Sequence, residues 1–273
     1  LGHRPEHEDL SASRELFRAG KLRECLAALQ GEVRGSPADA KLRTFLAQLL
    51  MLTGDWDRAV NQLQVAGELD SSALPMKHAY TAAIQCERLR AAVFAGERLP
   101  LILGDPPPWI AALLQALATL AQGRPEEAAG LRERALEEAP ATPGRLNGSA
   151  FDWIADADSR LGPVLEVFLN GAYYWAPFSR VRRIVIEPPA DVRDLVWAPA
   201  QITWSNEGEA VGLIPARYPG SERSEDEPVR LARKTEWQDL GGGAFAGLGQ
   251  RIFATSAEEL GLLEVRELVL ESA

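Results

Sequence analysis

The sequence predicts an α+β protein of two domains, an N-terminal TPR-like α–α superhelix followed by a small, mostly antiparallel β-barrel or bent-sheet domain. Turns in the first part recur at an interval typical of tetratricopeptide (TPR) repeats, and the segments between them have helical periodicity. The second part alternates apolar and polar residues with a period of two, and most of the seven tryptophans lie there. We therefore assign residues 1–145 to a helical repeat domain and residues 146–273 to a β-rich domain.

Several segments of the first part carry apolar residues at i, i+3, i+4 and i+7, which predicts amphipathic helices. These segments run from Leu22 to Val33, from Leu42 to Leu50, from Trp56 to Leu63 and from Ile110 to Leu117. Such helices are marginal alone in water, so they must bury their apolar faces against one another. Stacked helix pairs achieve this.

A common period relates the turns, because Gly20 and Gly54 lie 34 residues apart. Each glycine ends a first helix in a tight turn, and a small residue five positions later lets the second helix approach. Gly123 begins another copy of the pattern. We expect a degenerate unit between the second and last copies, with its helix at Met76 to Ala95, and an end of the array near Pro140.

Stacked helix pairs leave a concave face that binds peptides in many solenoid proteins. In one unit that face is expected to carry Lys41, Thr44 and Gln48. The apolar face of the last unit is formed by Ile110, Leu113 and Leu117. It either packs inside the protein or holds an amphipathic helix of a partner.

Short alternating runs after residue 150 are typical of strands with one buried face. They include RRIVIE around Ile184, QITWS around Ile202 and VRLAR around Leu231. Asn170-Gly171 predicts a tight hairpin, and SNEGE joins two further strands. We expect roughly six to eight strands, one helical turn near residues 191–195, and a flexible acidic loop at residues 220–228.

Arginine and tryptophan lie close together in this second domain in RDLVW and ARKTEW, and a further arginine ends GLGQR. Both residue types are enriched at the energetic centres of protein interfaces. They also fasten loops to a small β domain, since arginine can pair with a carboxylate while its stem covers an indole. Both interpretations stay open. The candidate partner-binding residues here are Trp153, Arg160, Arg193, Trp197 and Trp237.

The segment FDWIADADSRLGP holds Asp152, Asp156 and Asp158, and carboxylates at this spacing can bind a hard cation such as Mg²⁺ or Ca²⁺. They are too few for a cage made only of protein ligands. The alternative is that they cap a turn or pair with Arg160. A metal-dependent hydrolase built on these acids is therefore a competing hypothesis.

Other signs of catalysis or cofactor binding are lacking. The sequence contains no GxxxxGK[ST], no GxGxxG in a βαβ unit and no GxSxG. Cys25 and Cys86 fall in helical patterns, which favours buried free thiols in a reducing compartment. His3, His7 and His78 are too scattered for a catalytic base or a zinc site. We expect no cofactor and no catalytic residues.

The composition of the chain argues against some classes of binding partner. The formal net charge is -10 and no basic stripe is present, which argues against nucleic acid and anionic membranes as partners. No apolar run reaches the length of about 18 residues that a membrane span requires. We expect a cytoplasmic protein.

Several long motifs together resemble one known family. They are KLRTFLAQLLMLTGDWDRAVNQLQVAGELD, CERLRAAVFAGERLPLILGDPPPW, FDWIADADSRLGPVLEVFLNGAYYWAPF, RDLVWAPAQITW, RYPGSE and LARKTEWQDLG. In order and content they resemble the ImpE family, also called SciE or TagJ, of bacterial type VI secretion accessory proteins. The resemblance runs from about Leu42 to Leu270, which is most of the chain.

This resemblance implies a cytoplasmic accessory factor whose partner is the small subunit of the type VI sheath, recognised through a helical segment. It further implies a link to sheath handling by the ClpV-type AAA+ ATPase. The family has no catalytic residues to carry over. We therefore expect a protein-binding adaptor and not an enzyme, with a structural subunit of an oligomer as a further alternative.

Overall fold

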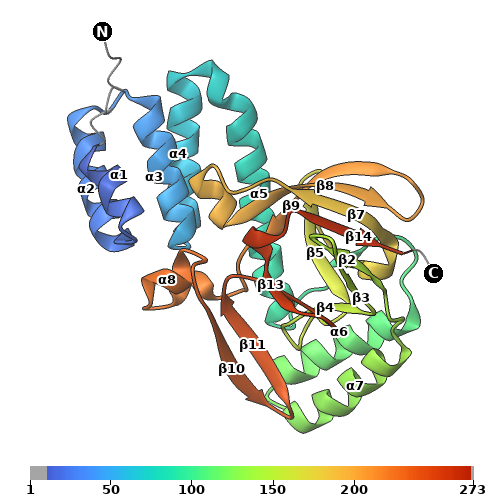
Figure 1. Ribbon diagram of the computed structural model, residues 1–273. Helices are drawn as coiled ribbons and strands as arrows, with labels where there is room; N and C mark the ends of the chain where they lie inside the picture. Colours follow the sequence, from blue (N-terminus) through green and yellow to red (C-terminus); the bar gives the residue numbers. More distant parts are fainter. Residues whose placement is uncertain (1–10, 272–273) are drawn as a thin grey trace. The chain divides into compact units, whose positions relative to one another are not determined.

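The chain folds into two compact units in the computed structural model, which describes residues 11–271 (Figure 1). The first unit ends at Lys77 and the second begins at His78. The last long helix ends much later, at Glu138, close to the division at residues 145 and 146 that the sequence suggests. The units divide earlier because the helices after residue 77 pack with the strands. His3 and His7 lie outside the described residues.

The first unit consists of paired helices. They are α1 (Ala12–Arg18), α2 (Leu22–Gly35), α3 (Ala40–Leu52) and α4 (Trp56–Leu69), followed by the 3₁₀ turn η1 (Ser71–Ala73). Asp39 begins α3, because its carboxylate accepts hydrogen bonds from the backbone N–H groups of Lys41 and Leu42. Every residue from Phe45 to Leu52 is buried. Helix α3 is thus central to this unit and packs against both α2 and α4.

The predicted turns are confirmed at the helix ends. Gly20, Gly54 and Gly123 have φ angles of 78°, 72° and 76°, in the left-handed region that glycine adopts without strain. Helices α1 and α2 form one hairpin, and α3 and α4 form the next. The small residues Cys25 and Ala59 are fully buried where the second helix of each pair begins, as the repeat pattern predicts.

Three more long helices lie before residue 140. They are α5 (Leu74–Phe94), α6 (Pro108–Ala121) and α7 (Pro125–Glu138). Helix α5 is a single long helix in the stretch where a degenerate repeat is expected. Helices α6 and α7 form a hairpin in which Ile110, Leu113 and Leu117 are 1%, 1% and 4% exposed. The apolar face of α6 therefore packs inside the protein and does not lie open to a partner.

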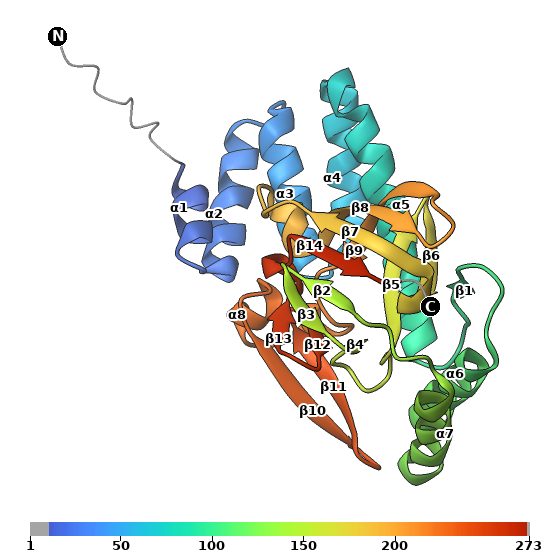
Figure 2. The ribbon, with the colours of Figure 1, turned by 45° about the vertical axis from the view of Figure 1, so that its right-hand side comes forward.

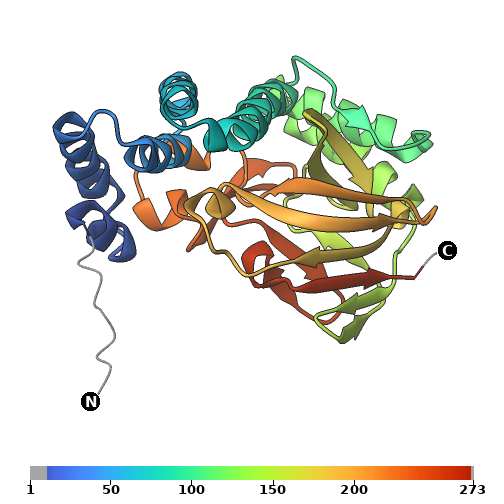
Figure 3. The same ribbon diagram turned by 90° about the horizontal axis from the view of Figure 1, so that it is seen from above.

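A nine-stranded sheet is the main element of the second unit, and its strand order is β1-β6-β5-β9-β8-β7-β14-β2-β3. Its strands are β1 (Leu101–Ile102), β2 (Gly144–Leu146), β3 (Ser149–Phe151), β5 (Val164–Leu169), β6 (Ala172–Pro177), β7 (Val181–Ile186), β8 (Trp197–Trp204), β9 (Glu209–Pro215) and β14 (Glu267–Leu270). All neighbours pair antiparallel except β1 and β6. Figure 3 shows β9, β8, β7 and β14 running side by side.

The sheet does not close into a barrel, so that part of the prediction is wrong. Strands β1 and β3 lie at opposite ends of the strand order and do not pair with each other. Strand β1 has only two residues and β3 only three, so neither edge offers a ladder long enough to close the sheet. The predicted hairpins are present: the turn at Asn170-Gly171 has φ angles of 50° and 77°, the signature of a type I′ turn.

Two smaller sheets complete the second unit. One is the sheet β13-β12-β4, formed by β4 (Ile154–Asp156), β12 (Ile252–Thr255) and β13 (Glu259–Gly261). The other is a ribbon of β10 (Thr235–Gly241) and β11 (Ala244–Gly249), which extends from the body of the unit in Figure 2. Phe253 on β12 packs edge-on against Phe178, with ring centroids 5.5 Å apart, and so joins the small sheet to the core of the large one.

Short helical turns link the strands. They are η2 (Phe178–Arg180), η3 (Val192–Leu195), η4 (Ser221–Arg223), α8 (Glu227–Arg230) and η5 (Leu262–Glu264). The turn expected near residues 191–195 is confirmed as η3. The strand expected for VRLAR is wrong, because Pro228 in the first turn favours helix α8. The acidic stretch at residues 220–228 is partly anchored: Ser221 is fully buried and its hydroxyl donates to the Tyr218 carbonyl at 2.6 Å.

Candidate functional site: a groove held by a buried ionic cluster

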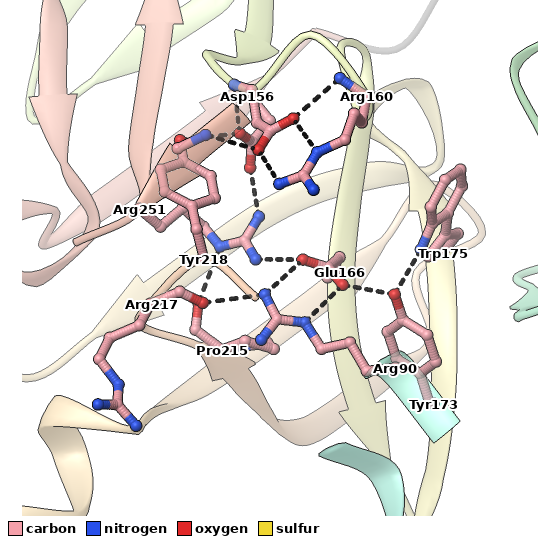
Figure 4. Close-up of polar contacts among 12 residues, drawn as sticks. Arg90, Asp156, Arg160, Glu166, Tyr173, Trp175, Pro215, Arg217, Tyr218 and Arg251 are labelled. Atoms are coloured by element: carbon pink, nitrogen blue, oxygen red, sulfur yellow. Dashed lines mark hydrogen bonds and ion pairs between the residues drawn. The ribbon is translucent and has the colours of Figure 1, made fainter. Parts of the chain in front are cut away.

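Helix α5 is fastened to the sheet by a buried arginine. Arg90 is 2% exposed, and its Nε and Nη2 donate to Oε1 and Oε2 of Glu166 on β5 at 2.8 and 2.9 Å (Figure 4). Its Nη2 also donates to the carbonyl of Arg217 at 2.9 Å. This two-pronged geometry is the strongest form of an arginine–carboxylate contact. It sets the position of α5 against the strands.

A second arginine extends the ionic cluster toward the small sheet. Arg251 is fully buried and pairs with both Glu166 and Asp156 (Figure 4). The hydroxyl of Tyr218 donates to Oδ1 of Asp156 at 3.0 Å and accepts from the N–H of Ile252 at 2.9 Å. Elements that are distant in sequence are thereby held together by one continuous network. We call Arg90, Asp156, Glu166 and Arg251 the ionic cluster.

Burial and charge act in opposite directions on the pKa values in the ionic cluster. Burial favours the neutral form of Glu166, but Arg90 and Arg251 outweigh it and lower its pKa to about 2. Burial raises the pKa of Asp156 to about 6; Arg251 offsets this only in part, and the nearby Asp158 adds to it. Carboxylates also raise the pKa values of both arginines. Both guanidinium groups are therefore charged at neutral pH.

Two of the three carboxylates in the FDWIADADSRLGP segment are buried and pair with arginine. Asp156 pairs with Arg251, while Asp158 accepts from Arg160 Nε at 2.8 Å and from the N–H of Gly247 at 2.9 Å. Asp152 is exposed. Among residues 11–271, no three His, Cys, Asp or Glu side chains converge as metal ligands would. The alternative in which these acids pair with Arg160 is confirmed for Asp158.

A mostly apolar groove lies where α5 crosses the sheet. It has a volume of about 330 Å³, within the range of small ligand or side-chain pockets. We call it the α5 groove. It is lined by Ala79, Ala82, Ala83, Cys86, Phe168, Asn170, Gly171, Arg193, Val211, Gly212 and Leu213. Val211 is 74% exposed at its edge.

Small residues keep the α5 groove open. A side chain on Gly171 would place its Cβ 3.6 Å from the Cβ of Ala82, and one on Gly212 would lie 2.8 Å from Leu169. Larger residues at these positions would fill the space or push the strands apart. Arg90 and Glu87 fasten the C-terminal half of α5 to Glu166 and Trp197, so α5 is held at the groove without a partner.

The structure separates the predicted residues of the second domain by exposure. Arg193 lines the α5 groove, pairs with Asp194 at 2.7 Å and lies over the ring of Tyr80. Trp197 is fully buried, and its indole N–H donates to Glu87 on α5 at 2.8 Å. Trp153 and Trp237 are each 43% exposed. Arg160, besides pairing with Asp158, lies over the ring of Phe94.

The predicted residues of the first unit lie on α3. Lys41 is exposed and Thr44 is half-buried, with its hydroxyl donating to the carbonyl of Ala40 at 2.9 Å. Gln48 is only 5% exposed. Of the three, Lys41 therefore presents the most side chain to solvent.

Sequence reasoning singled out Asp156 as a possible metal ligand but missed Glu166, Arg90 and the ion pairs that build the ionic cluster. Glu166 stands inside the apolar run VLEVFL, where a charged residue that faces the core requires a buried partner. That signal was available. Its partners Arg90 and Arg251 lie 76 and 85 residues away, and no local pattern identifies them.

Comparison with known proteins agrees with this architecture. The ImpE protein family model matches residues 148–269. The chain is 52% identical over 271 residues to the type VI secretion system accessory component TagJ of Pseudomonas aeruginosa, covering 99% of this chain and 95% of that protein. A crystal structure of a Vibrio parahaemolyticus protein superimposes with a TM-score of 0.87 at 23% identity, covering 96% of this chain and 98% of that one, and so shares the fold. By its sequence match over nearly its whole length, the chain belongs to the ImpE family.

Proposed function

We propose that this chain is a non-catalytic accessory protein of a bacterial type VI secretion system. In this role it is an adaptor that binds a helical segment of the small sheath subunit and links it to the ClpV-type AAA+ ATPase. The observation that carries the proposal is the 52% identity, over nearly the whole of both chains, to the accessory component TagJ. Relatives this similar usually share their general role.

The α5 groove suits a helical partner. Amphipathic helices bind by placing side chains at i, i+3, i+4 and i+7 into an apolar trough. The α5 groove is lined mainly by alanine, glycine and aliphatic residues, with Arg193 as its charged member. Val211 at its edge offers apolar surface that association would cover. We therefore place the helical segment of the partner in this groove.

Contacts outside the α5 groove must add to the affinity. Burying two leucine side chains contributes roughly 3–6 kcal/mol. Association costs at least about 4 kcal/mol in lost freedom of motion. The groove alone therefore supports weak binding, and the exposed Trp153 and Trp237 of the same unit are the proposed sources of further contact. Lys41, on the first unit, is a separate proposed contact for a partner. Four further residues act in this proposal by positioning their neighbours, namely Arg160, Trp197, Thr44 and Gln48.

Fluorescence anisotropy with a labelled helical segment of the small sheath subunit tests this proposal. We expect Ala82→Leu, which fills the groove, and Val211→Asp, which places a charge at its edge, each to weaken binding about tenfold. Leu99→Asp is the matched control, because Leu99 is 70% exposed and lies outside the groove. Unchanged affinity in both groove variants would rule out this surface. Lack of binding by the unmodified protein would rule out the adaptor role itself.

A further inference from the structure

Helix α7 presents a second side to its surroundings besides the one that it buries. Ala128, Leu131 and Ala135 are buried. A different stripe, at i, i+3, i+4, i+7 and i+8, lines an open groove of about 610 Å³ together with the tip of the β10–β11 ribbon. We call it the α7 groove. Its lining residues are Ala129, Arg132, Glu133, Leu136, Glu137 and Gly242.

The ribbon tip forms a fixed wall of the α7 groove. A Cβ on Gly242, which has a φ of +57°, would lie 2.4 Å from the carbonyl oxygen of Pro125, so only glycine fits there. Arg132 Nη2 donates to the Gly242 carbonyl at 2.7 Å and ties the tip to the helix. The groove is therefore already formed in the unbound protein, and its one arginine is engaged with the backbone.

An apolar side chain lies exposed in the α7 groove. Leu136 is 45% exposed, and its Cδ2 lies beside Gly162, where an added Cβ would be 3.0 Å from it. Covering the rest of this side chain would be favourable for an apolar group of a partner. The groove therefore has an apolar anchor point beside its charged rim.

The charges along the rim are unfavourably arranged for an isolated helix. Glu133 and Glu137 are like charges at i and i+4, which repel on a helix surface. Glu137 and Glu138 also lie in the last turn, where the helix dipole disfavours negative charge and no basic residue is present. Among residues 11–271, the ion pair made by this helix joins Arg124 and Glu127 at its other end. A cation placed at the rim would relieve both unfavourable interactions.

We propose that the α7 groove is a docking surface for a basic amphipathic helix of another protein. One apolar side chain of that helix packs on Leu136, and its lysine or arginine side chains pair with Glu133 and Glu137. The negative charges of Glu133 and Glu137 favour a partner helix that is positively charged. This surface is distinct from the α5 groove, with which it shares no residue.

The test uses a fluorescein-labelled amphipathic peptide made of leucine and lysine, with fluorescence anisotropy as the readout. We expect the double variant Glu133→Lys with Glu137→Lys to weaken binding about tenfold. The matched control is Glu126→Lys with Glu127→Lys, which changes the net charge equally on the same helix but outside the groove. We expect the control to change the affinity less than twofold, and Leu136→Ser to weaken binding as well.

Three results would overturn the proposal. Equal losses in the two double variants would show non-specific attraction to an acidic protein. Equally tight binding of a leucine–glutamate peptide would show that charge does not select the occupant. If light scattering showed a concentration-dependent dimer that the Leu136→Ser variant does not form, a second copy of the chain would be the molecule that covers the groove. Thermal unfolding checks the premise, since the single variant Glu137→Lys, which turns the repulsion with Glu133 into attraction and places a cation in the last turn, should melt at a higher temperature than the parent protein.

Discussion

Glu166 offers a sharp test of how the second unit is held together. It is fully buried and accepts hydrogen bonds from Arg90, Arg251 and Tyr173. The substitution Glu166→Gln keeps the size of the side chain but removes its charge. Arg90 would keep Glu87 at 3.2 Å, and Arg251 would keep Asp156. The two guanidinium groups would nevertheless face each other in the interior without the carboxylate that separates them.

The expected loss of stability is large. Removing one partner of a buried ion pair costs about 3–5 kcal/mol. For a unit of this size, each kcal/mol corresponds to about 2–4 °C in melting temperature. The variant should therefore melt roughly 6–20 °C below the parent protein. Total stabilities are about 5–15 kcal/mol, so a large part of the stability of the second unit would be lost.

Urea denaturation followed by tryptophan fluorescence measures this loss, because Trp175 and Trp197 are fully buried in the second unit. The control is Arg182→Ala, which breaks the pair with Glu207 at the surface, where the two side chains are 51% and 68% exposed. That change should cost less than about 1 kcal/mol. If Glu166→Gln cost no more than the control, the ionic cluster would not hold the unit together as we describe.

Further predictions concern acid, the ribbon tip and the thiols. Because the pKa of Glu166 is lowered from 4.5 to about 2, its contribution to stability should disappear as the pH falls through this range, and Glu166→Gln should flatten the loss in urea denaturation. Asp156 acts in the opposite sense between about pH 6 and 3.8, so the comparison belongs below pH 3.8. Gly242→Ala should destabilise the ribbon by about 1–3 kcal/mol, and amide exchange measures this loss. The loss should exceed that of Gly123→Ala, because a Cβ at Gly123 would lie in open space. Burial raises the thiol pKa values of Cys25 and Cys86 to about 12 and about 11, so neither should react with a thiol reagent at pH 8 until its own unit unfolds; fast labelling of the native protein would refute this.

Local patterns predicted much of the secondary structure. The glycines at the helix turns and the Asn170-Gly171 hairpin were predictable because their backbone conformation depends on the residue itself. The alternation that buries Ile184 and Ile202 was likewise visible in the sequence. The strand prediction for VRLAR was wrong because alternation over five residues also fits a short helix, and Pro228 favours the helix.

Long-range features were not predictable in the same way. Closure of a sheet depends on whether its two edge strands can pair. A strand as short as β1 has too few residues to show an alternating pattern in the sequence. The buried Trp197 donates its indole N–H to Glu87, which is 110 residues away in the chain. The α5 groove depends on how closely a helix approaches a sheet. That distance is set by packing and is not encoded in either element alone.

The ionic cluster also has a consequence for how the second unit reaches its native state. Its members come from α5, β4, β5 and the segment before β12, and the chain closes loops of 76 and 85 residues to join Glu166 to its two arginines. A partly assembled intermediate would hold a desolvated guanidinium or carboxylate without its counterion, which penalises every half-formed arrangement. Folding of this unit should thus be all-or-none, and evolutionary change at one of these four positions should require compensating change at the others.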